Sequence, residues 1–333
     1  MEAHETALPP TAGTRAVRIF SWATTALTFV FILNNYLKVW RDWPGAGAVL
    51  AGRLDALAVV QAALYLGAVV LAAAYVLRTP DRPLRADAAR LSGIVQFMIR
   101  AAFWAVLLIG VADTVISFLR IEGMLSAVVG PSLGGMLDFS ESRGPLVHYP
   151  LVLVGIVIAA LTRGTLGFHW LALLVVLAEL AIVVSRFIFS YEQAFMGDLV
   201  RFWYAALFLF ASAYTLAQDG HVRVDVFYSR FSDRAKGRAN AIGTVLFGIL
   251  FCWVVLVLGM STRSSIINAP LVSFEITQSG FGLYVKYLMA AFLGIFAVSM
   301  MVQFCGYLLE SVADWRGDPG SHLHDREGEL PAA

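Results

Sequence analysis

Residues 171–189 read LALLVVLAELAIVVSRFIF, and this nearly unbroken run of apolar side chains decides the fold class. A helix needs about 20 consecutive apolar residues to cross the hydrocarbon core of a bilayer. The run is too long, and alternates too little between polar and apolar residues, for a strand of a membrane β-barrel. We therefore expect residues 167–189 to form a helix that crosses a membrane.

The composition of the whole chain agrees with this reading. Only 14% of the 333 residues are charged, whereas soluble domains carry about 25%. Seven further apolar segments are long enough to span: 17–39, 56–77, 94–118, 146–162, 199–217, 240–262 and 284–309. The sequence thus predicts an all-α integral membrane protein with about eight transmembrane helices.

The loops between these segments suggest an orientation. If the N-terminus is cytoplasmic, the two densest groups of Lys and Arg, residues 78–90 and 223–238, both lie on the cytoplasmic side. We expect both termini there. The N-terminal residues MEAHETALPPTAGT lack the basic region and cleavage site of a signal peptide, so we expect the first span to remain.

Two loops on the opposite side are long and not very polar. Residues 120–145 are rich in glycine and include Pro131, and residues 263–283 mix polar residues with Phe274 and Phe281. Glycine and proline disfavour a further spanning helix. We interpret both loops as interfacial or re-entrant structure resting on protein or headgroups, with plain loops as the alternative.

Patterns of enzyme chemistry are mostly absent. The chain has no glycine-rich phosphate loop, no G-x-S-x-G, no HExxH and no Cys-x-x-Cys. Cys252 and Cys305 lie in apolar runs, which does not suit a disulfide framework or a thiolate metal site. His148 and His169 begin helices on opposite sides of the membrane, so they do not form a histidine pair at one depth that could hold a haem. We expect no catalytic, cofactor or metal site. The net charge of +1 does not indicate a nucleic-acid partner, and we expect none.

A few ionisable residues fall within the predicted spans, where charge is costly. Asp113 lies in the third span, and Glu179 lies midway along the fifth with Arg186 seven residues later on the same face. Glu179 could serve an ion or proton relay, but we favour a polar contact to a neighbouring helix or to Arg186. Asp198 and Arg201 are three residues apart and can pair on one helix face.

This scarcity of charge is itself informative. Secondary transporters usually carry paired broken helices at mid-membrane and a repeat symmetry, and neither is evident in this sequence. The sequence therefore favours a membrane subunit whose partner carries the transport site.

The stretch AQDGHVRVDVFY, residues 217–228, places His221, Arg223 and Asp225 at alternate positions. Our preferred interpretation is structural, with Arg223 and Asp225 bonding within the protein or to a partner subunit. A second is contact with anionic lipid headgroups, worth about 1 kcal/mol per basic residue. The basic residues for that contact are Arg223, Arg230, Arg234, Lys236 and Arg238. A third is proton coupling through His221.

Residues 167–311 resemble the small membrane subunit, DctQ type, of tripartite ATP-independent periplasmic (TRAP) transporters. The resemblance rests on Glu179 with SRFIF closing one helix, on Asp198 with Arg201 opening the next, on GHVRVD after an apolar helix, and on VKYLM opening the last. The family usually has Arg-Tyr where this chain has Arg186-Phe187, and Glu in place of Asp198. Its common form has four helices, so residues 1–165 are an addition that long variants of the subunit share.

The resemblance implies a role and a division of the chain. A periplasmic binding protein would capture an organic anion, and a large membrane subunit (DctM type) would move it inward on a sodium gradient. The small subunit would enlarge the fixed scaffold in the bacterial inner membrane, and sodium would bind the large subunit. We expect a polar tail at 1–16, extra helices at 17–165, a DctQ-like core at 166–316 and a flexible tail at 317–333. The alternatives are an anchoring or assembly protein and an autonomous carrier.

Overall fold

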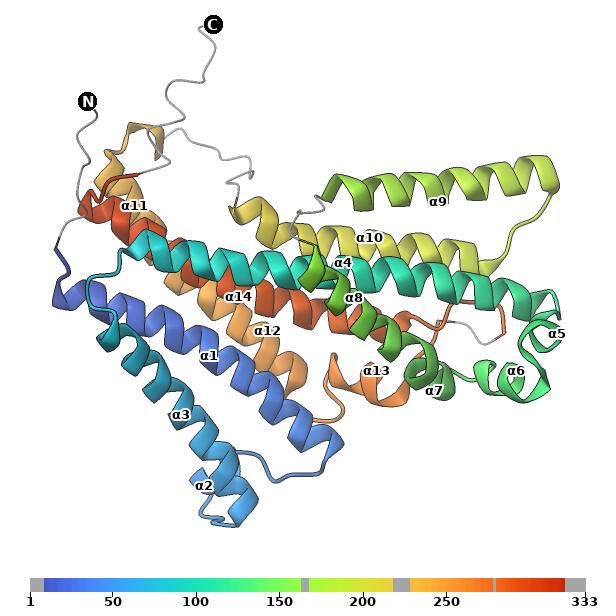
Figure 1. Ribbon diagram of the computed structural model, residues 1–333, viewed down its shortest axis with the longest axis horizontal. Coiled ribbons are helices and arrows are strands. Elements are labelled where there is room, and N and C mark those ends of the chain that lie inside the picture. Colours follow the sequence, from blue (N-terminus) through green and yellow to red (C-terminus); the bar gives the residue numbers. More distant parts are fainter. Residues whose placement is uncertain (1–8, 163–167, 218–227, 278–279, 321–333) are drawn as a thin grey trace, which may run out of the picture. The chain divides into compact units, whose positions relative to one another are not determined.

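The computed structural model describes residues 9–162, 168–217, 228–277 and 280–320, and these residues form helices and loops without a strand (Figure 1). Eight helical stretches in them are long and apolar enough to cross a membrane. Those stretches are Ala12–Trp40, Ala56–Arg78, Leu84–Ile121, Ser140–Leu161, His169–Phe189, Ala194–Ala217, Asp233–Met260 and Lys286–Arg316. The predicted fold class, an all-α membrane protein with about eight spans, is confirmed.

The longer helices are α1 (Ala12–Trp40), α3 (Ala56–Arg78), α4 (Leu84–Ile121), α8 (Tyr149–Leu161), α9 (Phe168–Phe189), α10 (Ala194–Ala217), α11 (Asp233–Gly243), α12 (Leu250–Met260) and α14 (Lys286–Arg316). The short ones are α2 (Gly47–Leu50), α5 (Leu125–Val129), α6 (Pro131–Leu137), α7 (Ser140–Arg143) and α13 (Asn268–Ser273). A π-helical turn, Gly144–His148, joins α7 to α8, and another, Thr244–Ile249, joins α11 to α12. Tyr228–Arg230 form one 3₁₀ turn.

Several helices extend beyond the apolar segments that predict them. Helix α1 begins five residues early because Thr11 and Thr14 form a capping box, in which each side chain bonds to the backbone N–H of the other residue. Helix α4 begins ten residues before position 94, and its polar first turns are stabilised by ion pairs of Arg85 and Asp87. Apolar patterning marks the part of a helix that suits lipid, not the ends that polar contacts add.

The described parts of the two long loops contain the short helices α5, α6, α7 and α13, several of whose residues are buried against protein. Their interfacial or re-entrant position in a membrane stays a prediction. In the first loop Gly130, at φ 88°, provides the turn before Pro131 begins α6, and Leu125 and Leu137 are buried. In the second loop Asn268 is buried at the start of α13, and its amide donates to the carbonyls of Met260 and Thr262.

The chain divides into two compact units. One comprises Met1–Ile94, Leu216–Val254 and Met300–Ala333. Within it α1 runs beside α3 (Figure 1). The buried side of α1 is lined by small polar residues, namely Ser21, Thr24, Thr25 and Thr28, which allow close helix approach in a membrane. Phe31 of α1 also packs edge-on against Trp253 of α12, with ring centroids 5.8 Å apart.

The other unit comprises Val95–Thr215 and Val255–Ser299. Its core is an aromatic and aliphatic cluster: Val106, Ile109, Ala178, Phe195, Phe202, Trp203, Ala206, Phe210, Leu283, Val285 and Phe292. Helix α8 lies so close to α4 that a Cβ on Gly155 would fall 2.7 Å from the backbone nitrogen of Ala105. A glycine is therefore required at this crossing.

Candidate functional site

The second unit contains a fully buried carboxylate, that of Asp113 in α4. Its Oδ1 lies 2.8 Å from Nη1 of Arg143 and 3.2 Å from Nε2 of His148, and its Oδ2 accepts the backbone N–H of Tyr284 at 2.8 Å. The side chains of Asp113, Arg143 and His148 are fully buried. We call Asp113, Arg143, His148 and Tyr287 the Asp113 network.

Arg143 has a partner for each side of its guanidinium. Nε and Nη2 donate to the carbonyl of Leu137 at 2.9 and 2.6 Å, and Nη1 also donates to the hydroxyl of Ser117 at 3.1 Å. The guanidinium carbon lies 4.2 Å from the centroid of the Tyr284 ring. A buried ion pair is stable only when its remaining hydrogen-bonding groups are satisfied, and those of Arg143 are well supplied.

His148 extends this network to α14. Its Nδ1 lies 2.8 Å from the hydroxyl of Tyr287. A carboxylate only accepts, so Nε2 carries the proton toward Asp113, and in the neutral imidazole the Tyr287 hydroxyl donates to Nδ1. The network therefore links α4, the π-helical turn before α8 and the start of α14 by directed hydrogen bonds.

A second carboxylate, Asp198 in α10, binds Leu283, the residue before Tyr284 in the segment that precedes α14. Its Oδ2 accepts the backbone N–H of Leu283 at 3.1 Å, next to the Tyr284 N–H that Asp113 accepts. Arg120 donates to the carbonyl of Gly282 at 2.8 Å, and its guanidinium lies 4.3 Å from the Tyr284 ring centroid. Three charged side chains from α4 and α10 thus fix the segment that leads into α14.

Beyond these helices, the Tyr191 hydroxyl donates to a carboxylate oxygen of Glu122 at 2.8 Å. Burial, the hydrogen bond and the negative charge of Glu122 raise the pKa of Tyr191 to about 12. The hydroxyl therefore keeps its proton and this contact through the physiological pH range.

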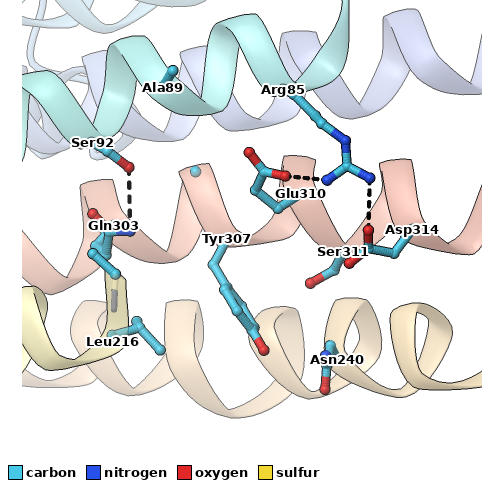
Figure 2. A pocket seen from close by; sticks show the side chains of 12 residues that line it. Arg85, Ala89, Ser92, Leu216, Asn240, Gln303, Tyr307, Glu310, Ser311 and Asp314 are labelled. Atoms are coloured by element: carbon cyan, nitrogen blue, oxygen red, sulfur yellow. Dashed lines mark hydrogen bonds and ion pairs between the residues drawn. The ribbon is translucent and has the colours of Figure 1, made fainter. Parts of the chain in front are cut away.

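The first unit contains a polar cavity of about 230 Å³ (Figure 2). It is lined by Arg85, Ala89 and Ser92 of α4, Leu216 and Ala217 of α10, Asn240 of α11, and Gln303, Gly306, Tyr307, Glu310, Ser311 and Asp314 of α14. Figure 2 shows Arg85 reaching from α4 to the carboxylates of Glu310 and Asp314, the latter at 2.7 Å. We call Arg85, Glu310 and Asp314 the Arg85 cluster.

Two features show what the cavity can hold. Arg85 also donates to the carbonyls of Asp318 and Pro319, at 3.1 and 2.9 Å, so its charge is fully engaged. The amide of Gln303 donates to Ser92 at 3.4 Å, while the buried Oε1 of Gln303 has no hydrogen-bond partner among the described residues. A polar space of this size and lining suits a few water molecules.

A further buried ion pair fixes the beginning of α4. Nε of Arg18 lies 2.7 Å from Asp87, and the rest of its guanidinium donates to the carbonyl and hydroxyl of Thr79 at 2.7 and 2.9 Å. Arg82, at 2.8 Å, and the Tyr75 hydroxyl, at 3.1 Å, also contact Asp87. The ends of α1, α3 and α4 are joined by this one carboxylate.

Most of the residues singled out from the sequence lie outside the buried clusters described above. Asp198 pairs with Arg201 at 3.1 Å, as their spacing predicts, although Asp198 is buried and does not lie on the surface. Arg186 pairs with Glu192 at 3.3 Å and not with Glu179. Glu179 is exposed on α9 and has no hydrogen bond or ion pair among the described residues.

The stretch with alternating charges cannot be placed, since His221, Arg223 and Asp225 lie outside the described residues. Of the basic residues that follow, Arg230, Arg234 and Arg238 are exposed. Arg238 lies 5.8 Å from the Trp315 ring, and Lys236 lies 3.9 Å from Asp233. Their proposed contact with lipid headgroups stays a prediction.

Sequence reasoning missed most of the buried clusters. Asp113 and His148 were noted separately and not joined, Arg85 was noted only within the basic group 78–90, and Arg143 was not singled out. The available signal was polar residues at the ends of apolar spans, which need partners. Within the described ranges, no three His, Cys, Asp or Glu residues converge as metal ligands. The site consists of ion pairs that fix helices.

A comparison with protein families identifies one region of the chain. Residues 172–314 match the family model described as "Tripartite ATP-independent periplasmic transporters, DctQ component". No curated protein and no solved structure matches the chain. The matched region runs from α9 into α14, and α1 to α8 precede it.

Proposed function

We propose that the chain is the fixed scaffold subunit of a TRAP transporter, because residues 172–314 match the model of the DctQ component of these transporters and the chain carries eight helices long and apolar enough to span a membrane in its described residues. A periplasmic binding protein delivers an organic anion to a large membrane subunit in the bacterial inner membrane. The large subunit moves the anion inward on a sodium gradient. This chain binds neither the anion nor sodium but holds the surface against which the large subunit moves.

The observation that carries this proposal is the state of the buried charges. Each buried charged side chain among the described residues is paired within the chain: Arg18, Asp87, Asp113, Arg143, His148 and Asp198. A substrate or ion pathway needs polar groups that exchange partners during transport. Charges locked between helices suit a rigid support.

The same contacts suggest a role for the residues before the family region. Asp113 accepts the backbone N–H of Tyr284, and the Arg143 guanidinium lies over the ring of Tyr284. His148 shares a hydrogen bond with the Tyr287 hydroxyl, and Arg85 pairs with Glu310 and Asp314. The extra helices therefore enlarge the scaffold as part of one fold. We keep the predicted limits, 17–165 for the extension and 166–316 for the core, as part of this proposal.

Uptake in proteoliposomes tests the proposal. Vesicles with this chain, the large membrane subunit and added binding protein should accumulate labelled dicarboxylate, 2-oxo acid or sulfonate only under an inward sodium gradient. Vesicles without this chain should accumulate none. Uptake by this chain alone would identify an autonomous carrier, and unchanged uptake without it would identify an anchoring or assembly protein.

A further inference from the structure

Helix α9 carries a charge at the centre of a span. Glu179 lies eleven residues after Phe168 and ten before Phe189. At a rise of about 1.5 Å per residue, its Cα is about 15 Å from either end of the helix, which is the middle of a hydrocarbon core about 30 Å thick. Of the eight spans in the described residues, α9 is the least buried within the chain.

One side of α9 packs against the core of the second unit. Leu171 and Ala178 are buried, and Leu174 and Val175 pack against the core cluster of the second unit. Glu179 lies about 100° around the helix from Ala178, on a flank that it shares with four other residues at intervals of three and four. These are Ala172, Val176, Val183 and Arg186, of which Val176, Val183 and Arg186 are exposed.

Exposure of this flank to lipid is energetically unfavourable because of the charge of Glu179. A charged side chain at the bilayer centre costs roughly 2.5–3.5 kcal/mol on insertion scales and is usually paired or faces protein. No side chain in the described part of the chain bonds to Glu179. A second copy of this chain, docked about a two-fold axis through this flank, would bring two carboxylates together and add repulsion.

We propose that the flank of α9 formed by Ala172, Val176, Glu179, Val183 and Arg186 docks a transmembrane helix of the large membrane subunit. That helix presents an Arg, a Lys or another hydrogen-bond donor to Glu179 at mid-membrane. The inference rests on the proposed function and adds to it the partner-binding surface and the chemistry of the partner's contact.

Photo-crosslinking in the assembled complex tests the surface. A benzophenone amino acid is placed in the tagged full-length chain at Val176 or Val183, and as controls at Leu177 or Val184 on the opposite flank. Val183 and Leu177 are matched in exposure, at 48% and 49%. Crosslinks to the large subunit should form from Val176 and Val183 at least fivefold more than from the controls.

Substitution of Glu179 tests the charge. Glu179→Leu removes the group that lipid disfavours, so the level of the chain and its monodispersity in detergent should be unchanged or improved. The large subunit recovered with it should fall roughly threefold to twentyfold, the range of polar contacts between membrane helices. Glu179→Gln, which can still accept a hydrogen bond, should lose less, and Leu177→Ala should lose nothing.

The outcomes separate the two proposals. If the wild-type chain recovers no large subunit, the proposed function fails. If it recovers the subunit but crosslinks come equally from both flanks, come only from the controls, or join two copies of this chain, the docking surface is wrong and the function stands. Full recovery with Glu179→Leu would equally overturn the surface.

Discussion

At the scale of single residues, a rigid scaffold depends on buried charges that are satisfied within the chain. Asp113 receives bonds from Arg143, His148 and the Tyr284 backbone at once. Such a group contributes little beyond a well-packed apolar core, but losing one partner of a buried pair leaves the other charge uncompensated. The Asp113 network should therefore be far more sensitive to substitution than exposed pairs.

Replacing Asp113 with alanine tests this difference. Asp113→Ala strands the buried guanidinium of Arg143, so the purified chain should lose about 3–5 kcal/mol of stability. Arg186→Ala breaks an ion pair whose partners are 60% and 52% exposed, so it should cost about 1 kcal/mol or less. Thermal unfolding in detergent compares the two. Equal melting temperatures would contradict the role of the network.

Whether the sequence predicts the pairing of two charged residues depends on how far apart they lie along the chain. Asp198 and Arg201 are three residues apart, so helix geometry alone predicts their pairing. Asp113 and Arg143 are thirty positions apart, and Arg85 and Asp314 are 229 apart. No periodicity in one sequence specifies which of several charged residues will meet across a fold, so these pairs were not predicted.

At the scale of elements, two kinds of contact hold helices together. Gly155 brings α8 against the backbone of α4, and the Arg85 cluster joins α4 to α14. Hydropathy predicts the spans themselves because lipid selects for length and apolar character. Hydropathy does not predict the polar start of α4 or the polar end of α14, which stabilise each other through the ion pairs of Arg85 with Glu310 and Asp314.

A pair of glycine substitutions tests the close approach of α8. Gly155→Ala places a Cβ against the Ala105 backbone, so α8 must shift and stability should fall. Gly67→Ala in α3 meets nothing within 4 Å, so it should raise stability by about 0.5–1 kcal/mol through helix propensity. Melting temperatures should change in opposite directions. A neutral Gly155→Ala would show that the crossing tolerates separation.

A charge exchange tests the Arg85 cluster. Arg85→Glu places a third acid beside Glu310 and Asp314, and the chain should lose about 1.5–3 kcal/mol, the value of charge-assisted hydrogen bonds. Adding Glu310→Arg to that variant restores an opposite pair and should recover part of the loss. Unfolding of the wild type, both single variants and the double variant measures the coupling. Additive effects would mean that the cluster does not join the helices.

At the scale of the whole molecule, the helices before residue 172 share both compact units with the region that matches the DctQ family model. In one unit α1, α3 and the start of α4 share contacts with α11, α12 and the end of α14, such as Phe31 with Trp253. In the other unit α4 and α8 share the core with α9, α10 and the start of α14. The sequence showed an extension before the family region but not that its helices complete both units.

Removal of the extension tests this integration. A chain that starts at residue 166 lacks Asp113 and Arg143, which contact the backbone N–H and the ring of Tyr284. It also lacks Arg85, so the carboxylates of Glu310 and Asp314 lose this partner. It should aggregate or fail to accumulate when expressed beside the full-length chain under the same conditions. A truncated protein that is monodisperse and melts at the temperature of the full chain would show that the extension is a separate attachment.

We propose that this chain is a scaffold that works only in complex with a large membrane subunit. The most direct measurement is affinity purification of the tagged full-length chain from native membranes in mild detergent, followed by mass spectrometry and size measurement. A stable complex with one large, multi-span subunit in equal amounts should be recovered. A chain that elutes alone, with no large membrane protein recovered at comparable amount, would contradict it.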